Sequence, residues 1–219
     1  MLIQIIPTIL CTDERECLRR LSLIEPAVNW IHIDVMDGTL TKETCWHEPA
    51  ALLEHRYNLF YELHLMVKDP MPIIDAWRRV SGFKRAIIHA EIPKKIGHMI
   101  TEIRKRHLEA GIAISPQTPL AKIKPFLKKL DGGVLVIGGK IGKSGQKWNP
   151  KTLKTVQELR KLCPKMPIGF DIGVNTKTIP LIVRAGANRI CSGKAIFKSP
   201  SPLRAAITLQ SIAEHSVGL

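Results

Sequence analysis

The sequence predicts a (β/α)8 TIM barrel that forms one domain over residues 1–219. Short apolar runs rich in β-branched residues recur eight times, and an amphipathic stretch follows each of them. Eight such strand–helix pairs fill nearly the whole chain and leave no room for a linker or a second domain. The chain is also 45% hydrophobic, enough for a large core. A doubly wound open sheet is the alternative, because periodicity does not show whether a parallel sheet closes.

The expected elements alternate from the first residues to the last. The strands are expected at residues 3–10, 30–36, 60–67, 85–90, 111–115, 133–139, 168–173 and 189–193. The helices are expected at residues 13–25, 47–57, 71–81, 94–109, 119–130, 150–162, 176–185 and 203–215. Asn149 and Asn175 are typical of helix starts, and Gly82, Gly111 and Gly186 are typical of helix ends.

Charge and cysteine usage limit the compartment and the partners. The chain has 33 basic and 19 acidic residues, a net charge of +14, which favours phosphorylated metabolites, nucleic acid or acidic surfaces. Its five scattered cysteines suggest neither a disulfide framework nor a zinc knuckle, so a reducing cytoplasm is expected. The apolar start lasts only about ten residues without a basic leader, so we expect a strand there, with no signal peptide and no membrane span.

Polar residues late in the strands are the functional candidates, because barrel active sites lie at the carboxyl ends of the strands. His32 and Asp34 are two apart on one strand and therefore share a face, His64 lies on the next strand, and Asp171 ends the seventh. Taken alone, each histidine is more typical of a core residue, and an aspartate before a turn is more typical of a cap. If they are buried together, the desolvation of each ionisable group costs several kcal/mol unless mutual pairing or a bound metal compensates for it. Two imidazoles and two carboxylates predict one divalent ion: zinc, iron, manganese or cobalt.

Glycine-rich segments after the last three strands are candidates for phosphate binding, for which backbone N–H groups and lysines are suited. The alternative is a set of flexible connections. The candidate residues are Gly142, Ser144, Gly145, Gly173, Ser192, Gly193 and Lys194. His89 and Glu91 form a further H-x-E pair after the fourth strand, for which an exposed capping loop and substrate contact are both open.

Several motifs in the same order resemble the ribulose-phosphate 3-epimerase family over almost the whole chain. They are "PTIL" (7–10), "HIDVMDG" (32–38), "HLMVKDP" (64–70), "GQKW" (145–148), the segment "DIGVNTKTIPLIVRAGAN" from Asp171, and "SGKAIF". The resemblance implies that the metal is held by His32, Asp34, His64 and Asp171. It also implies that Asp34 removes the C3 proton of a 2-ketose phosphate and Asp171 returns one on the other face, through an enediolate that the metal stabilises.

Other positions match the family or depart from it in ways that concern the substrate. Met36 and Met66 match methionines that line the family's site, although ordinary core filling explains them equally well, and Thr8 replaces a serine but keeps a hydroxyl. The segment after "HIDVMDG" is "TLTKETCWHEP" in place of the family's aromatic residue and asparagine. In the strand-six segment, where the family has a methionine and then a proline before its glycines, this chain has Ile137, Gly138, Gly139 and Ile141. Ile172 replaces the first of the two glycines that follow the strand-seven aspartate in the family.

The phosphate motif departs as well, because Lys194 replaces a serine in "SGKAIF". Phosphate binding is therefore expected to depend more on side-chain charge from Lys194, Lys143 or Lys140. We expect a small-molecule sugar-phosphate substrate, and the resemblance implies a homo-oligomer.

The expected activity is sugar-phosphate 3-epimerisation, most simply between D-ribulose 5-phosphate and D-xylulose 5-phosphate. A 3-epimerase for another ketose phosphate, such as a hexulose 6-phosphate, is an alternative that the altered loops leave open. A decarboxylase or aldol-synthase barrel is disfavoured because the D-x-K-x-x-D pattern is absent from the third strand, which reads "ELHLMVKD".

A non-catalytic, polyanion-binding barrel is the remaining alternative, supported by the charge of +14 and by "RKRH" (104–107) and "KKL" (128–130). These clusters lie on predicted outer helices, where a solvated face is normal, and aromatic residues for base stacking are few. No nucleic acid partner is therefore expected. The P-loop, dinucleotide-binding and nucleophile-elbow motifs are absent from the sequence.

Overall fold

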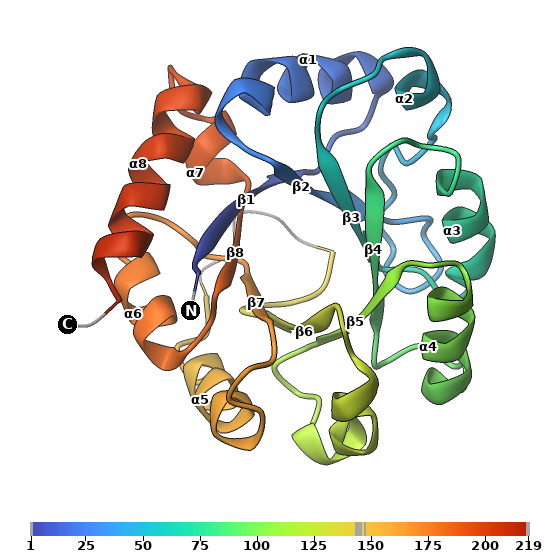
Figure 1. The fold of residues 1–219 in the computed structure, drawn as a ribbon, viewed down its shortest axis with the longest axis vertical. Coiled ribbons are helices and arrows are strands. Elements are labelled where there is room, and N and C mark those ends of the chain that lie inside the picture. Colours follow the sequence, from blue (N-terminus) through green and yellow to red (C-terminus); the bar gives the residue numbers. More distant parts are fainter. Residues whose placement is uncertain (1, 143–145, 147, 218–219) are drawn as a thin grey trace.

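Eight parallel strands form a closed barrel in which each strand pairs with the next along the chain and β8 pairs with β1 (Figure 1). The computed structural model describes residues 2–142, 146 and 148–217. The predicted barrel is confirmed, and the open-sheet alternative is wrong. The strands are β1 (Gln4–Ile9), β2 (Trp30–Val35), β3 (Phe60–Leu65), β4 (Phe83–His89), β5 (Glu109–Ile114), β6 (Gly133–Ile137), β7 (Ile168–Asp171) and β8 (Arg189–Ser192).

Helices surround the barrel and cover the outer face of its strands (Figure 1). The α-helices are α1 (Glu14–Ile24), α2 (Ala50–Glu54), α3 (Met71–Trp77), α4 (Ile96–Lys105), α5 (Thr152–Leu162), α6 (Ile179–Ala185), α7 (Lys194–Phe197) and α8 (Pro202–His215). The 3-10 helices are η1 (Glu25–Ala27), η2 (Leu120–Lys122) and η3 (Lys124–Lys129). Among the described residues, no helix is long and apolar enough to cross a membrane, and all five cysteines are free thiols.

The hydrophobic residues form two separate clusters, as expected when strands alternate their side chains between two faces. The larger cluster lies between strands and helices and includes Ile31, Ile33 and Val35 of β2. A small cluster fills part of the barrel interior; it contains Ile6, Ile87, Ala113, Leu135, Ile137 and Cys191. The alternate residues of β2, His32 and Asp34, therefore point into the barrel.

Two local predictions about the helices are wrong, and one short helix was not predicted. The segment 119–130 forms η2 and η3 in place of one α-helix, because Pro125 lacks an N–H and its ring clashes with the carbonyl four residues earlier. Helix α4 ends at Lys105, and Gly111, predicted to end it, lies inside β5. The left-handed residue after α4 is His107, with φ 59°. The short helix α7 was not predicted.

Candidate active site and metal centre

A cavity of about 790 Å³ opens at the carboxyl ends of the strands. The predicted site residues that line it are Thr8, Asp34, Met36, His64, Met66, Gly142, Asp171, Gly173, Ser192, Gly193 and Lys194. His32 is fully buried and lies just beneath, behind Asp34. Ser144, Gly145 and Lys143 lie outside the described residues.

The four predicted metal ligands converge at the base of this cavity. Strand pairing sets Asp34 directly beside His64, and Ile137 of β6 beside Asp171. Asp34 Oδ1 lies 2.8 Å from His64 Nδ1 and 3.3 Å from His32 Nε2. One ligand atom from each of the four residues lies within 4.8 Å of all the others, so one cation could contact all four.

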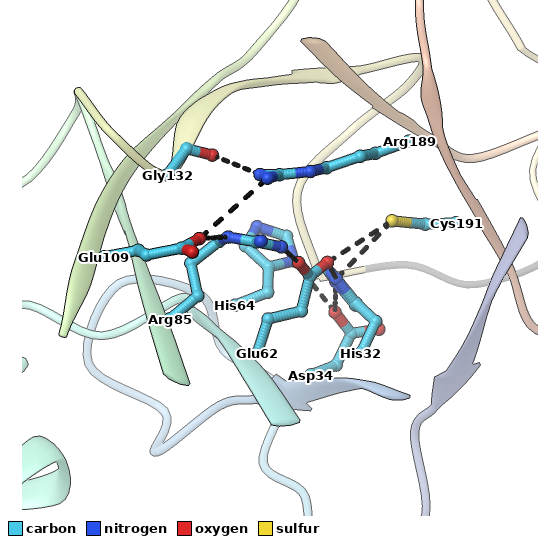
Figure 2. Close-up of polar contacts among 9 residues, drawn as sticks. All are labelled: His32, Asp34, Glu62, His64, Arg85, Glu109, Gly132, Arg189 and Cys191. Carbon is cyan, nitrogen blue, oxygen red and sulfur yellow. Dashed lines mark hydrogen bonds and ion pairs between the residues drawn. The ribbon is translucent and has the colours of Figure 1, made fainter. Parts of the chain in front are cut away.

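The hydrogen bonding of His32 suits a metal ligand. Its Nδ1 lies 2.6 Å from Glu62 Oε1 (Figure 2), and an ionised carboxylate only accepts, so Nδ1 carries the proton. His32 Nε2 is buried and has no hydrogen-bond partner among the described residues. A buried imidazole nitrogen left with a free lone pair beside a carboxylate fits a divalent cation.

The two aspartates differ in their affinity for a proton. Burial alone would raise the pKa of Asp34, but the adjacent imidazoles of His32 and His64 outweigh it and hold that pKa well below its usual range. Burial and the negative charge of Asp34 raise the pKa of Asp171. Such a pair suits acid–base chemistry, in which one carboxylate accepts a proton and the other donates one.

A second cluster, His32, Glu62 and Cys191, is fully buried and shares His32 with the first. Figure 2 shows the contacts among its three residues. Cys191 Sγ is 3.5 Å from His32 Nδ1 and 3.8 Å from Glu62 Oε1. Burial raises the pKa of Cys191 to about 12, so it is a neutral thiol, and Glu62 already pairs with Arg85. These contacts fit a hydrogen-bonded support for His32 better than a second metal.

Charged residues deeper in the barrel continue from Glu62 (Figure 2). Arg85 is buried, forms an ion pair with Glu62 and donates to Glu109 Oε2 at 2.7 Å. Its guanidinium also lies 4.2 Å from the centre of the Trp30 ring. These residues were not among the predicted site residues, because they do not lie at the carboxyl ends of their strands. The alternation of side chains along a strand could have predicted that Glu62 points into the barrel, since Glu62 precedes His64 by two residues and lies on the same face.

The H-x-E pair after β4 is neither an exposed loop nor part of the cavity lining. His89 is completely buried, and its Nε2 lies 2.8 Å from His64 Nε2. Its Nδ1 lies 2.9 Å from Glu91 Oε2. The interpretation of His89 as part of an exposed loop is therefore wrong, and the pair belongs to the surroundings of His64.

Two hydroxyls in the cavity wall lack partners. Thr8 Oγ1 and Ser192 Oγ are buried, and neither forms a hydrogen bond within the part of the chain that the structure describes. Thr8 pairs with His32 across β1 and β2, and Ser192 with Pro7 across β8 and β1. Because buried polar atoms normally have a partner, both hydroxyls are suited to contact a polar ligand in the cavity.

The altered segment after β2 reaches across the mouth of the barrel. An isolated bridge joins Asp37 to Thr44, and Cys45 Sγ lies 3.1 Å from both Met36 N and Asp34 O. A Cβ on Gly142, after β6, would lie 3.0 Å from Thr41 Cβ. The segment that departs most from the family pattern therefore borders the cavity.

The turn after Asp171 has an unusual backbone. Ile172 and Gly173 have φ values of 77° and 78°, and this left-handed region is unfavourable for a β-branched residue. Ile172 thus keeps a strained conformation where the resemblance leads one to expect glycine.

Replacing Gly173 with alanine is expected to destabilise the protein by about 2 kcal/mol or more. A Cβ there would lie 2.4 Å from Trp148 Cβ, in addition to the unfavourable φ. Urea unfolding would measure the loss. Gly97→Ala is the control, since its Cβ would meet only the Phe126 ring at 3.1 Å; equal stability of the two variants would contradict the prediction.

The chain is similar to known proteins over most of its length. The model of the ribulose-phosphate 3 epimerase family matches residues 4–197. Ribulose-phosphate 3-epimerase of Schizosaccharomyces pombe is 33% identical and covers 91% of this chain and 89% of its own. The enzyme of the same name from Rhodobacter capsulatus is 32% identical, covering 91% and 88%. The crystal structure of KGPDC from Streptococcus mutans shares the fold, with a TM-score of 0.75, 13% identity and full coverage of both chains.

Proposed function

Because the chain belongs to the ribulose-phosphate 3-epimerase family, and is thus an epimerase acting on carbohydrates, we propose that it interconverts D-ribulose 5-phosphate and D-xylulose 5-phosphate. The observation that carries the proposal is the convergence of His32, Asp34, His64 and Asp171 at the base of the cavity. A hexulose 6-phosphate is the alternative substrate, since the altered segment after β2 borders the same cavity.

We propose that these four residues hold one divalent ion. Zinc, iron, manganese or cobalt suits the two imidazoles better than magnesium. The partnerless His32 Nε2 supports this assignment. Such an ion supplies positive charge that stabilises the oxyanions of an enediolate.

The proton transfers are assigned to the two aspartates. Asp34, with its lowered pKa, is ionised and accepts the C3 proton of the ketose phosphate. Asp171 is assigned the return of a proton to the opposite face of C3. Met36 and Met66 are almost completely buried in the cavity wall and would exclude water from the reacting carbon. Opposed carboxylates of this kind account for inversion at one carbon.

The substrate phosphate is assigned to the loops after β6, β7 and β8. Gly142, Gly173, Gly193 and the Ser192 hydroxyl offer polar groups, and Lys194 brings a positive charge to the rim. Helix α7 has only four residues, so side-chain charge has more to contribute than a helix terminus.

Lys194→Ala is expected to raise KM for the sugar phosphate by about tenfold, with kcat little changed, because one charge-assisted hydrogen bond is lost. Steady-state kinetics would measure both constants. Lys161→Ala, which removes an exposed lysine on α5 that does not line the cavity, is the control. A fall in kcat alone would argue against a phosphate contact.

The test of the proposed function is exchange of the C3 proton with solvent deuterium. Purified protein loaded with zinc, iron, manganese or cobalt would be incubated in D2O with pentulose and hexulose phosphates, and the C3 signal followed by NMR. Exchange and epimerisation of ribulose 5-phosphate are expected. Turnover of a hexulose phosphate alone would select the alternative substrate, and no exchange with any ketose phosphate would refute the proposal.

The remaining assignments rest on resemblance and composition. We propose that residues 1–219 form one domain, that the protein assembles as a homo-oligomer, and that it is cytoplasmic, like the rice relative named as a cytoplasmic isoform. Five free thiols agree with a reducing compartment. Light scattering on the purified protein would give the oligomeric state.

A further inference from the structure

His89 of β4 lies between a proposed metal ligand and a carboxylate. On one side its Nε2 is 2.8 Å from His64 Nε2, and on the other its Nδ1 is 2.9 Å from Glu91 Oε2. The opposite nitrogen of His64, Nδ1, is the atom that faces Asp34. One continuous chain of hydrogen bonds therefore leads from Glu91 to the proposed metal centre.

The far end of the chain fixes its direction. The N–H of Ser115 donates to Glu91 Oε1 at 2.9 Å, and the hydroxyl of Thr118 donates to the same oxygen. An ionised carboxylate can only accept, so the N–H at His89 Nδ1 donates a hydrogen bond to Glu91. In neutral His89 the other nitrogen, Nε2, is then an acceptor.

The acceptor on His89 determines the tautomer of His64. His64 Nε2 must carry its proton to donate to His89 Nε2, so in the metal-bound protein Nδ1 is the nitrogen whose lone pair would face the ion. Nδ1 lies 2.8 Å from Asp34 Oδ1, within the group of four ligand atoms, and a bound cation would take the place of a proton between these two atoms. The ring is also held in place, because His89 is completely buried and His64 nearly so.

We infer that His89 and Glu91 are positioning residues that hold His64 in the tautomer and orientation required for metal binding through Nδ1. This inference rests on the proposed metal site. Glu62 contacts His32 Nδ1 directly, so Nε2 is the nitrogen that remains for the ion. Glu91 acts on His64 through the intervening imidazole of His89, so Nδ1, which faces Asp34, is the nitrogen that would bind the ion. The two histidines thus present different ring nitrogens to the same cation, each set by a carboxylate outside the ligand set.

Glu91→Gln is the decisive variant because it keeps the size of the side chain. The N–H of Ser115 can only donate, so the amide oxygen of the glutamine is favoured on the side of Ser115 and the amide NH2 on the side of His89. An NH2 group facing His89 Nδ1 requires that Nδ1 be an acceptor, which is the opposite tautomer of His89. That tautomer places a proton on His89 Nε2, and His64 must then move its own proton to Nδ1. The expected result is a 10- to 100-fold weaker Zn²⁺ affinity, measured by competition with a chromophoric chelator.

Further readouts separate positioning from a general structural role. In the Zn²⁺-loaded wild type, ¹⁵N NMR of the histidines should show His64 protonated at Nε2 and His89 at Nδ1. The absorption spectrum of the Co²⁺-substituted protein should change in Glu91→Gln and in His89→Leu. His89→Gln, whose amide can still accept from His64, should restore part of the affinity.

Asp69→Asn is the matched control. Asp69 is an exposed carboxylate in the neighbouring loop after β3 and pairs with Lys94 at 3.1 Å. Its replacement removes the same charge and should leave Zn²⁺ affinity unchanged. If wild type binds one Zn²⁺ and folded Glu91→Gln and His89→Leu bind it within twofold of wild type, with an unchanged Co²⁺ spectrum, the inference is overturned while the proposed metal site stands. Failure of wild type to bind Zn²⁺ or Co²⁺ at all would overturn both.

Discussion

Asp171→Asn is expected to lower the rate of epimerisation by about 10³-fold while exchange of the C3 proton persists for one of the two epimers. Asp34 would still remove the proton on its own face of the carbon and exchange it with solvent. Without Asp171, no group returns a proton to the opposite face, so exchange continues without inversion. The magnitude is that of losing one general acid–base group.

Asp34→Asn should show the complementary result, in which exchange of the C3 proton is confined to the other epimer. Each epimer would be incubated separately in D2O with each variant, and exchange and conversion followed by NMR. Both aspartates are also proposed metal ligands, so the metal content of each variant has to be measured in parallel. Asparagine keeps one oxygen that can ligate, which makes it preferable to alanine here.

Asp37→Asn is the control for both variants. Asp37 lies three residues after Asp34 in the same motif, but its carboxylate accepts from Thr39 N at 2.9 Å in a turn and does not line the cavity. Its activity should stay close to that of wild type. Loss of exchange from both epimers in Asp171→Asn with full metal occupancy would contradict the assignment of opposed bases.

The sequence was sufficient to predict the barrel and the late strand residues. Eight apolar runs gave the repeat number, and the alternation of His32 and Asp34 with apolar neighbours gave the inward face. The helix at 119–130 was wrong because amphipathic spacing outweighed Pro125 in that prediction. A proline four or more residues into a short segment should have indicated 3-10 turns.

The surroundings of the ligands could be predicted only in part. His89 and Glu91 were recognisable as a pair, but which residue each would contact depends on how β3, β4 and β5 pair, since Glu91 meets residues after β5. Strand register across a barrel is not encoded in local spacing. The two-residue period of the strands predicts that Glu62 and Arg85 also point into the barrel. They were not counted as site residues because they lie early in their strands, where barrel residues serve stability more than catalysis.

Arg85→Met is expected to destabilise the protein by about 3–5 kcal/mol, because it leaves the buried carboxylate of Glu62 without its ion-pair partner. Burial would raise the pKa of Glu62, but the charge of Arg85, followed by the contact with His32, lowers it to about 2. The substitution also removes the contact of the guanidinium with Trp30. Urea unfolding of the two proteins would measure the difference in free energy.

Two further variants separate this effect from a simple loss of packing. Arg106→Met removes an arginine from a surface cluster with Asp75 and Glu102 and should cost no more than about 1 kcal/mol. Glu62→Gln combined with Arg85→Met removes both buried charges yet keeps an acceptor for His32, so it should recover more than half of the lost stability. If the double variant is less stable than Arg85→Met, Arg85 stabilises the barrel through packing and its contact with Glu109, and not by neutralising Glu62.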